Sequence, residues 1–281
     1  MLRMFFGKGF CLGFMAGVAA IFLAPHLLLD LSILSTARTR SGIMQHLDSR
    51  EWLQRGREVT DDELSQGGDL TGHTHSKRKI LKIDSTTVVK LSPNLDMAEV
   101  DNLVFIRSHT TIPVPRVLNA YEKEGCRYIV MEFIDGENLK GVWPKLSVED
   151  RESICSELHE YLFQMRNIPA PEALIGSVSG GPAPVHQDIY EAMHRTDHEI
   201  VFSHGDLAFH NILVRDGHIA AILDWEYAGW YPEHWDFCQS LQFFGGIDEH
   251  YQFAKKAFGK TYLSEALMDM WFTRGVKHGG W

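Results

Sequence analysis

Residues 204–211 read HGDLAFHN and place a carboxylate and an amide at a spacing that suits phosphoryl transfer. This reaction needs a cation that holds the phosphates, Mg²⁺ ions that bridge them and a carboxylate that orients the attacking hydroxyl. Asp206 can accept or orient the proton of a substrate hydroxyl. Asn211 offers an amide oxygen, which is a hard ligand of the kind Mg²⁺ prefers. The segment therefore predicts a catalytic loop with Asp206 as the base.

A second carboxylate, Asp224, follows a predicted hairpin. Residues 211–214 and 219–223 have the apolar pattern of short strands, and the Asp-Gly pair at 216–217 is a strong two-residue turn signal. A hairpin returns the chain on itself, so Asp224 is expected beside Asn211. The sequence thus predicts Asp224 as the principal metal carboxylate and Asn211 as its companion ligand.

The remaining elements indicate an α+β protein with a small sheet lobe and a larger helical lobe. Their apolar periodicity and turn residues predict strands, helices and a helical tail. The expected elements are strands at 80–83, 86–91, 127–132 and 200–202, helices at 96–108 and from Ser147 to Pro169, and a helical tail from Glu233. The strand at 127–132 is largely apolar, which predicts an interior position in the sheet.

The N-terminal region has a different composition. Residues 9–29 contain no formally charged side chain and are long enough to span a bilayer, so 1–34 is interpreted as a hydrophobic helix and membrane anchor. A cleaved signal peptide and a helix packed on the domain remain alternatives. Residues 35–78 are polar and are expected as a linker, with a helix at the capping box 60–63.

Composition and charge narrow the range of possible functions. The chain has 281 residues, 44% hydrophobic residues and a formal net charge of −10. These values are typical of a globular protein with no basic face for a nucleic-acid backbone, so no nucleic-acid partner is expected. The four cysteines are scattered and form no zinc or disulfide pattern.

HGDLAFHNILV, followed by ILDWEYAGWYPEHWD, resembles the aminoglycoside phosphotransferases and their kinase-like relatives, particularly the fungal members. The resemblance extends from Lys79 to Asp236. It implies a bilobal protein-kinase-like fold, with an N-lobe at 79–136 and a C-lobe at 137–281. It also implies ATP and Mg²⁺ as cofactors and a small hydroxylated metabolite as the phosphate acceptor.

The same resemblance assigns further roles around the nucleotide. Lys90 would contact the α- and β-phosphates and Glu99 would orient that lysine. Side chains alternate along a strand, so Val88 shares the face of Lys90 and would cover the adenine. The hinge would be formed by Met131, Glu132 and Ile134, and the catalytic loop would be supported by His204 and Asp236.

Two features depart from the family pattern. No G-x-G-x-x-G run precedes Lys90, and the phosphate-covering loop is assigned to residues 72–76. The chain is also short after Asp236. The missing glycine-rich run and the short part after Asp236 motivate the alternative of a membrane-tethered pseudokinase or scaffold without turnover. The predicted location is membrane-anchored with the kinase-like domain in the cytosol, or simply cytoplasmic.

Overall fold

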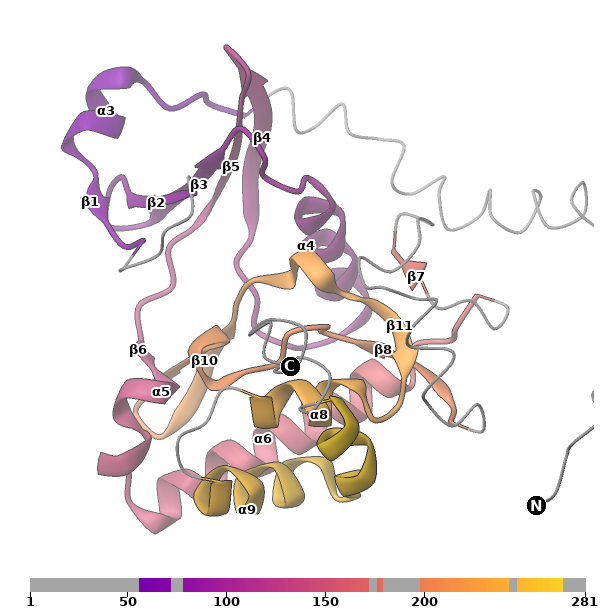
Figure 1. Ribbon diagram of the computed structural model, residues 1–281. Coiled ribbons are helices and arrows are strands. Elements are labelled where there is room, and N and C mark those ends of the chain that lie inside the picture. The colour runs from indigo at the N-terminus through magenta and orange to yellow at the C-terminus, as the bar shows by residue number, and fades with distance from the viewer. Residues whose placement is uncertain (1–55, 72–77, 172–175, 179–197, 243–246, 270–281) are drawn as a thin grey trace, which may run out of the picture. The chain divides into compact units, whose positions relative to one another are not determined.

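The computed structural model describes residues 56–71, 78–171, 176–178, 198–242 and 247–269, all of which belong to one unit formed by residues 51–281 (Figure 1). The expected hydrophobic helix at 1–34, the candidate anchor at 9–29 and the candidate phosphate loop at 72–76 lie outside the described residues. Among the residues that are described, no helix is both long enough and apolar enough to cross a membrane.

The N-lobe is a five-stranded antiparallel sheet with the strand order β1-β2-β3-β5-β4. The strands expected at 80–83 and 86–91 are confirmed as β2 and β3, which pair with each other, and β5 lies in the interior of the sheet as expected. The strands are β1 (Gly68–Asp69), β2 (Lys79–Lys82), β3 (Thr87–Ser92), β4 (Val117–Lys123) and β5 (Cys126–Glu132).

Strand β4 is a feature that the sequence patterns did not predict. It pairs with β5 through a two-residue turn at Glu124 and Gly125, both with positive φ (53° and 73°). As an edge strand it carries polar residues such as Asn119 and Glu122, which weaken the apolar alternation of a typical strand. Strand β4 is therefore recognised by its pairing with β5 and not by its own sequence pattern.

One face of this sheet is covered by the segment that precedes it. Val59 is buried with Leu81, Val89 and Val130 in an apolar cluster. Helix α3 (Asp61–Gln66) follows, and its capping box is present, with Thr60 and Glu63 bonded reciprocally. The described part of the expected linker, residues 56–71, therefore belongs to the packed N-lobe, because its few apolar side chains are used to cover the sheet.

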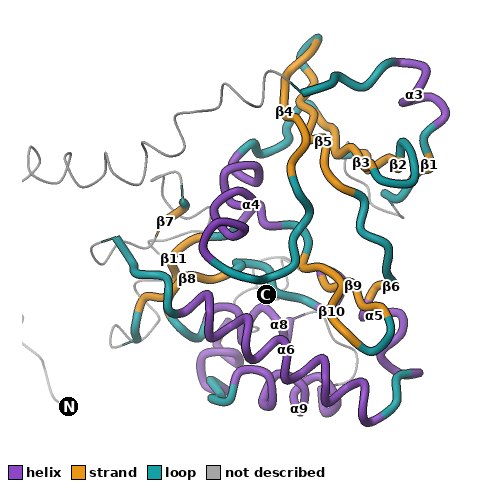
Figure 2. Tube along the Cα trace, turned by 180° about the vertical axis from the view of Figure 1, so that it is seen from behind, coloured by secondary structure: helices purple, strands orange, loops and turns teal. Residues whose placement is uncertain are grey.

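Helix α4 (Ala98–His109) connects β3 to β4 and packs between the sheet and the helical lobe (Figures 1 and 2). Val100, Leu103 and Ile106 are buried, while the first turn carries Glu99. The spacing of one helical turn between apolar positions places Glu99 on the side that faces the interior.

The C-lobe combines short strands with a layer of helices, and Figure 2 shows α6, α8 and α9 gathered on one side of the small strands. Two three-stranded sheets are present, β10-β9-β6 and β7-β11-β8. The strands are β6 (Glu137–Asn138), β7 (Gly176–Ser177), β8 (Ile200–Ser203), β9 (Ile212–Arg215), β10 (His218–Ile222) and β11 (Gly229–Pro232); the helices are α5 (Leu139–Val142), α6 (Val148–Arg166), α8 (Trp235–Gln242) and α9 (Ile247–Phe258), with 3₁₀ turns η3 (Trp143–Lys145), η4 (Phe209–Asn211) and η5 (Trp225–Tyr227).

Two local predictions in this lobe are confirmed. The Ser147 side chain accepts a hydrogen bond from the Asp150 N–H at 3.0 Å and starts α6, whose buried stripe is Ile154, Leu158, Leu162 and Met165. Strands β9 and β10 pair across Asp216 and Gly217, which have φ values of 53° and 77°. A mirror-image turn of this kind requires positive φ at both positions, which the Asp-Gly pair tolerates.

Candidate active site

The predicted catalytic loop follows β8 and is held by its backbone. Both carboxylate oxygens of Asp236, at the start of α8, accept hydrogen bonds at 3.0 Å, one from the N–H of His204 and the other from that of Gly205. The Trp235 indole donates to the Gly205 carbonyl at 3.0 Å. Burial raises the pKa of Asp236 to about 6, while the two N–H donors oppose that increase. Asp236 therefore bonds the backbone of residues 204 and 205, the loop that the sequence analysis expects it to support.

His204 is buried and bonded through both ring nitrogens. Nε2 lies 2.9 Å from the Leu223 carbonyl, and Nδ1 accepts from the Asp206 N–H at 3.2 Å. A carbonyl can only accept and an N–H can only donate, so the ring carries its proton on Nε2. Burial lowers the His204 pKa to about 4, which keeps the ring neutral. His204 therefore joins the loop to the end of β10 and is not placed as a base.

Asp206 and Asn211 face each other within the loop. The Asn211 amide nitrogen donates to the Asp206 carbonyl at 2.9 Å and to its carboxylate at 3.2 Å. The amide oxygen of Asn211 is thereby turned away from Asp206, as a metal ligand requires. Burial, and then the charge of Asp224, raise the pKa of Asp206 to about 6. A carboxylate with this pKa can exchange a proton near neutral pH.

Asp224 reaches the loop as the predicted hairpin requires. The N–H of Leu223 donates to the Asn211 carbonyl at 2.8 Å, which ties the end of β10 to the end of the catalytic loop. Asp224 itself adopts a left-handed conformation (φ 62°, ψ 58°). This conformation is costly for a residue with a side chain and is held here by its surroundings.

Lys90 links the sheet to this loop. Its Nζ lies 2.7 Å from Glu99 Oε2 and 2.5 Å from Asp224 Oδ1. Register explains the placement, because Lys90 is opposite Ile129 on β5 and Val88 is opposite Met131, so these four residues share one face of the sheet. The structure thus brings together the lysine and two carboxylates that the sequence assigned.

The charges of this trio depend on one another. Burial alone would lower the Lys90 pKa, but the charges of Glu99 and Asp224 outweigh it and raise that pKa. Burial likewise opposes ionisation of Asp224, yet Lys90 and Arg78 lower its pKa below the ordinary value. Glu99 is the most deeply buried of the three, and burial raises its pKa. Lys90 therefore stays charged, and Asp224 stays a carboxylate.

Asn102 is a site residue that the sequence did not single out. It lies one turn after Glu99 on α4, is buried, and donates from Nδ2 to the Trp225 carbonyl at 2.6 Å. Helix α4 therefore positions Glu99 and also holds the segment that follows Asp224. The i, i+3 spacing from Glu99 is the signal by which this residue could have been found.

Arg78 and Glu226 complete the charged group, although the sequence patterns assign neither of them a role in nucleotide binding. The Arg78 guanidinium lies 2.6 Å from Glu226 Oε2 and 3.8 Å from Asp224 Oδ1.

The predicted hinge is the end of β5 and the segment after it. The Glu132 N–H donates to the Arg116 carbonyl at 2.9 Å, and that of Phe133 donates to the Thr86 carbonyl at 2.7 Å. The N–H of Ile134 forms no hydrogen bond to any residue that the structure describes. It therefore remains able to bond an adenine edge, whereas the Glu132 N–H does not.

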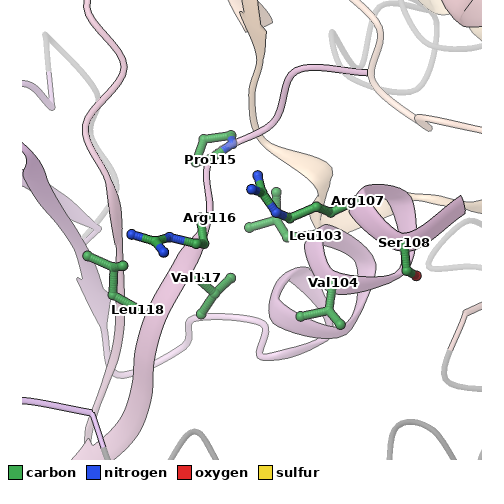
Figure 3. Close-up of a pocket in the computed structure, with 8 residues that line it drawn as sticks. All are labelled: Leu103, Val104, Arg107, Ser108, Pro115, Arg116, Val117 and Leu118. Carbon is green, nitrogen blue, oxygen red and sulfur yellow. The ribbon is translucent and has the colours of Figure 1, made fainter. Parts of the chain in front are cut away.

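A separate cavity of about 560 Å³ lies between α4 and β4 and includes none of the predicted site residues (Figure 3). Its lining includes Arg107, Arg116 and Ser108 together with apolar residues such as Val104 and Val117 (Figure 3). This cavity is distinct from the candidate active site around Lys90 and Asp206.

The donor set fits a divalent metal. Glu99, Asp224 and Glu226 each place one carboxylate oxygen within 4.8 Å of the others. Two cationic side chains, Lys90 and Arg78, already approach these carboxylates, which shows that the position favours positive charge. Closely spaced hard oxygen donors suit Mg²⁺ better than a soft metal.

A lysine on an antiparallel sheet that meets a carboxylate of a second lobe, beside a loop with a further carboxylate and an amide, is the arrangement that phosphoryl transfer from ATP needs. A sequence model of the phosphotransferase enzyme family (APH) matches residues 70–183 and 177–263. The match covers more than half of the chain, so the protein belongs to this family. A search of curated protein sequences returns no match.

Solved structures of similar fold are aminoglycoside phosphotransferases. The ternary complex of APH(2")-IIa with streptomycin and ATP has 13% sequence identity and a TM-score of 0.54, over 82% of this chain and 85% of that one. The ADP-bound APH(2'')-Ib has 14% identity and a TM-score of 0.55, over 82% and 86%. APH(4)-Ia has 13% identity and a TM-score of 0.55, over 78% and 93%. At sequence identities this low, the structural similarity establishes a shared fold. It confirms the predicted bilobal kinase-like architecture.

Proposed function

We propose that the protein transfers the terminal phosphoryl group of ATP, in the presence of Mg²⁺, to a hydroxyl of a small molecule. The observation that carries this proposal is the contact of Lys90 with Asp224, because it joins the nucleotide-facing sheet to the catalytic loop. Family membership supports the same reaction class.

Asp206 would orient the acceptor hydroxyl and take its proton, since its carboxylate is partly exposed and has a pKa near 6. Asn211 and Asp224 would hold Mg²⁺, with Glu226 near enough to contribute. Bound Mg²⁺ would neutralise charge on the phosphates that it bridges. Lys90, kept charged by Glu99, would bind the α- and β-phosphates.

The adenine would lie against Val88 and Met131, which are opposite each other in the sheet and largely buried. The free N–H of Ile134 and the backbone carbonyl of Glu132 would bond its edge. His204 and Asp236 would act only by positioning the loop.

The acceptor is proposed as a small hydroxylated metabolite. Structures of similar fold bind streptomycin, gentamicin and hygromycin B, as their names state. A screen of ADP formation over aminoglycosides, sugars and amino alcohols tests the proposal, with Asp206→Asn as the matched control. The proposal would be contradicted if both proteins formed ADP equally, or if neither protein formed ADP with any acceptor.

The pseudokinase alternative makes a different prediction. A scaffold without turnover would need to have lost part of the phosphate-handling set, whereas the contacts of Lys90 with Asp224 and of Asp206 with Asn211 support an intact set. A thermal-shift assay with ATP and Mg²⁺ separates binding from catalysis. A shift without turnover on any acceptor would favour the scaffold.

The proposed location keeps the kinase-like domain in the cytosol, where ATP and Mg²⁺ are abundant, with residues 9–29 as a candidate anchor. Proteinase protection of membrane vesicles tests this placement. Release of the protein by a salt wash would argue against an anchor.

A further inference from the structure

Arg78 directly precedes β2, and its side chain crosses to the acidic segment of the other lobe. Nη2 lies 2.6 Å from Glu226 Oε2, and Nη1 lies 3.8 Å from Asp224 Oδ1. The latter oxygen is the same one that Lys90 contacts at 2.5 Å. Asp224 therefore meets two cations that come from neighbouring strands of the sheet.

The two cations differ in how firmly they are enclosed. The Lys90 side chain is 4% exposed and bonds two carboxylates, whereas the Arg78 side chain is 28% exposed. Lys90 is thus fixed, and Arg78 retains access to a ligand. A guanidinium also presents paired N–H donors in a plane, a geometry that matches phosphate oxygens.

The position of Arg78 relative to the catalytic loop indicates which phosphate it would meet. Its partner Glu226 lies in η5, next to Tyr227, whose carbonyl packs against Gly205 of the loop. Arg78 is therefore bonded to the segment that packs against the catalytic loop, and we expect the phosphate to be transferred to lie beside that loop.

We propose that Arg78 is a phosphate-binding residue that contacts the terminal phosphate of ATP, and that Glu226 holds it beside Asp224 when no nucleotide is bound. This inference rests on the proposed function. Arg78 would supply a cationic phosphate contact directly before β2, in a chain that has no G-x-G-x-x-G run before Lys90. The competing possibility is an ion pair that only clamps β2 to the helical lobe.

Titration calorimetry of the full chain with AMP, ADP and ATP, each with Mg²⁺, distinguishes the two possibilities. For Arg78→Gln we expect ATP affinity to fall roughly 10- to 100-fold, as for a lost charge-assisted hydrogen bond, and ADP affinity to fall less than about threefold. Arg78→Lys keeps the charge without the fork and should give an intermediate loss for ATP.

Arg57→Gln is the matched control, because it removes an exposed arginine that pairs with Glu63 at 2.5 Å in the same lobe. It should leave all three affinities unchanged. An equal effect of Arg78→Gln on all three nucleotides, or an unchanged ratio of ATP to ADP affinity with a lower Tm, would overturn the inference in favour of the clamp. A parent protein that binds no nucleotide would refute the proposed function itself, and this inference with it.

Discussion

The two halves of the active site are held by different kinds of interaction. On the sheet side, Lys90, Glu99 and Asp224 are positioned by charged side chains that meet across the two lobes. On the loop side, residues 204–211 are positioned by backbone N–H and carbonyl groups that bond to Asp236 and Trp235. The first half should respond to changes of charge and the second to changes of shape.

The largest expected effect falls on Asp206, which lies in the loop half and is the predicted proton acceptor. Asp206→Asn keeps the shape of the side chain and its contact with Asn211 but removes the proton acceptor. We expect kcat to fall by roughly 10²- to 10⁴-fold, the usual contribution of a general base, with ATP affinity nearly unchanged. Steady-state kinetics and calorimetry measure the two quantities. A variant that keeps at least a tenth of parent turnover would remove Asp206 from the catalytic role.

The loop half is tested by a change of shape at Gly205. This residue has φ +89°, and a Cβ there would lie 2.3 Å from the Tyr227 carbonyl oxygen. Gly205→Ala should therefore destabilise the protein by about 1–3 kcal/mol or more and displace the loop. Thermal unfolding and turnover report the two consequences.

Gly141→Ala is the control for that substitution, because the residue is in a helix and, apart from that helix and the adjoining residues, no atom of the described residues lies within 4 Å of the added Cβ. It should leave the Tm unchanged or slightly higher. Equal Tm values for the two variants would show that the loop is not held by close packing at Gly205.

The sheet half is tested by removing a charge without changing volume. In Glu99→Gln, Lys90 would keep only Asp224 as an ionic partner. We expect ATP affinity to fall about tenfold, since Lys90 would be drawn toward the metal carboxylate and away from the phosphates. Glu63→Gln, on an exposed pair with Arg57, is the control and should have no effect on nucleotide binding. ATP affinity that matches the parent would show that Glu99 does not orient Lys90.

The same contrast explains what the sequence could predict. The capping box at 60–63, the Ser147 cap and the Asp216-Gly217 turn are local patterns, and the structure confirms each of them. The proximity of Asp224 to the predicted catalytic loop follows from a short hairpin, and the hydrogen bond from Leu223 to Asn211 shows that return of the chain.

The residues that were missed act over long separations. Arg78 pairs with Glu226 at a separation of 148 residues, and Asn102 bonds Trp225 at a separation of 123. Nothing in their neighbouring residues indicates these partners, because two lobes must first pack together. Strand β4 was missed for a related reason, since an edge strand is defined by the strand beside it.

The smallest expected effect is a pH dependence of kcat/KM that arises from the loop half. Burial and the nearby Asp224 raise the Asp206 pKa to about 6, and only the carboxylate form can accept a proton. As pH falls through 6 the active form is lost, so kcat/KM should decrease about tenfold between pH 7 and pH 5.

Glu99 also has a raised pKa and could produce a similar decrease, so the two halves must be separated. Glu99→Gln should retain the acid limb if Asp206 causes it, because the substitution leaves the loop contacts in place. The residual activity of Asp206→Asn should be independent of pH over the same range. An acid limb that disappears in Glu99→Gln instead would place the titrating group on the sheet side, and Lys90 would then depend on the ionisation of its buried partner.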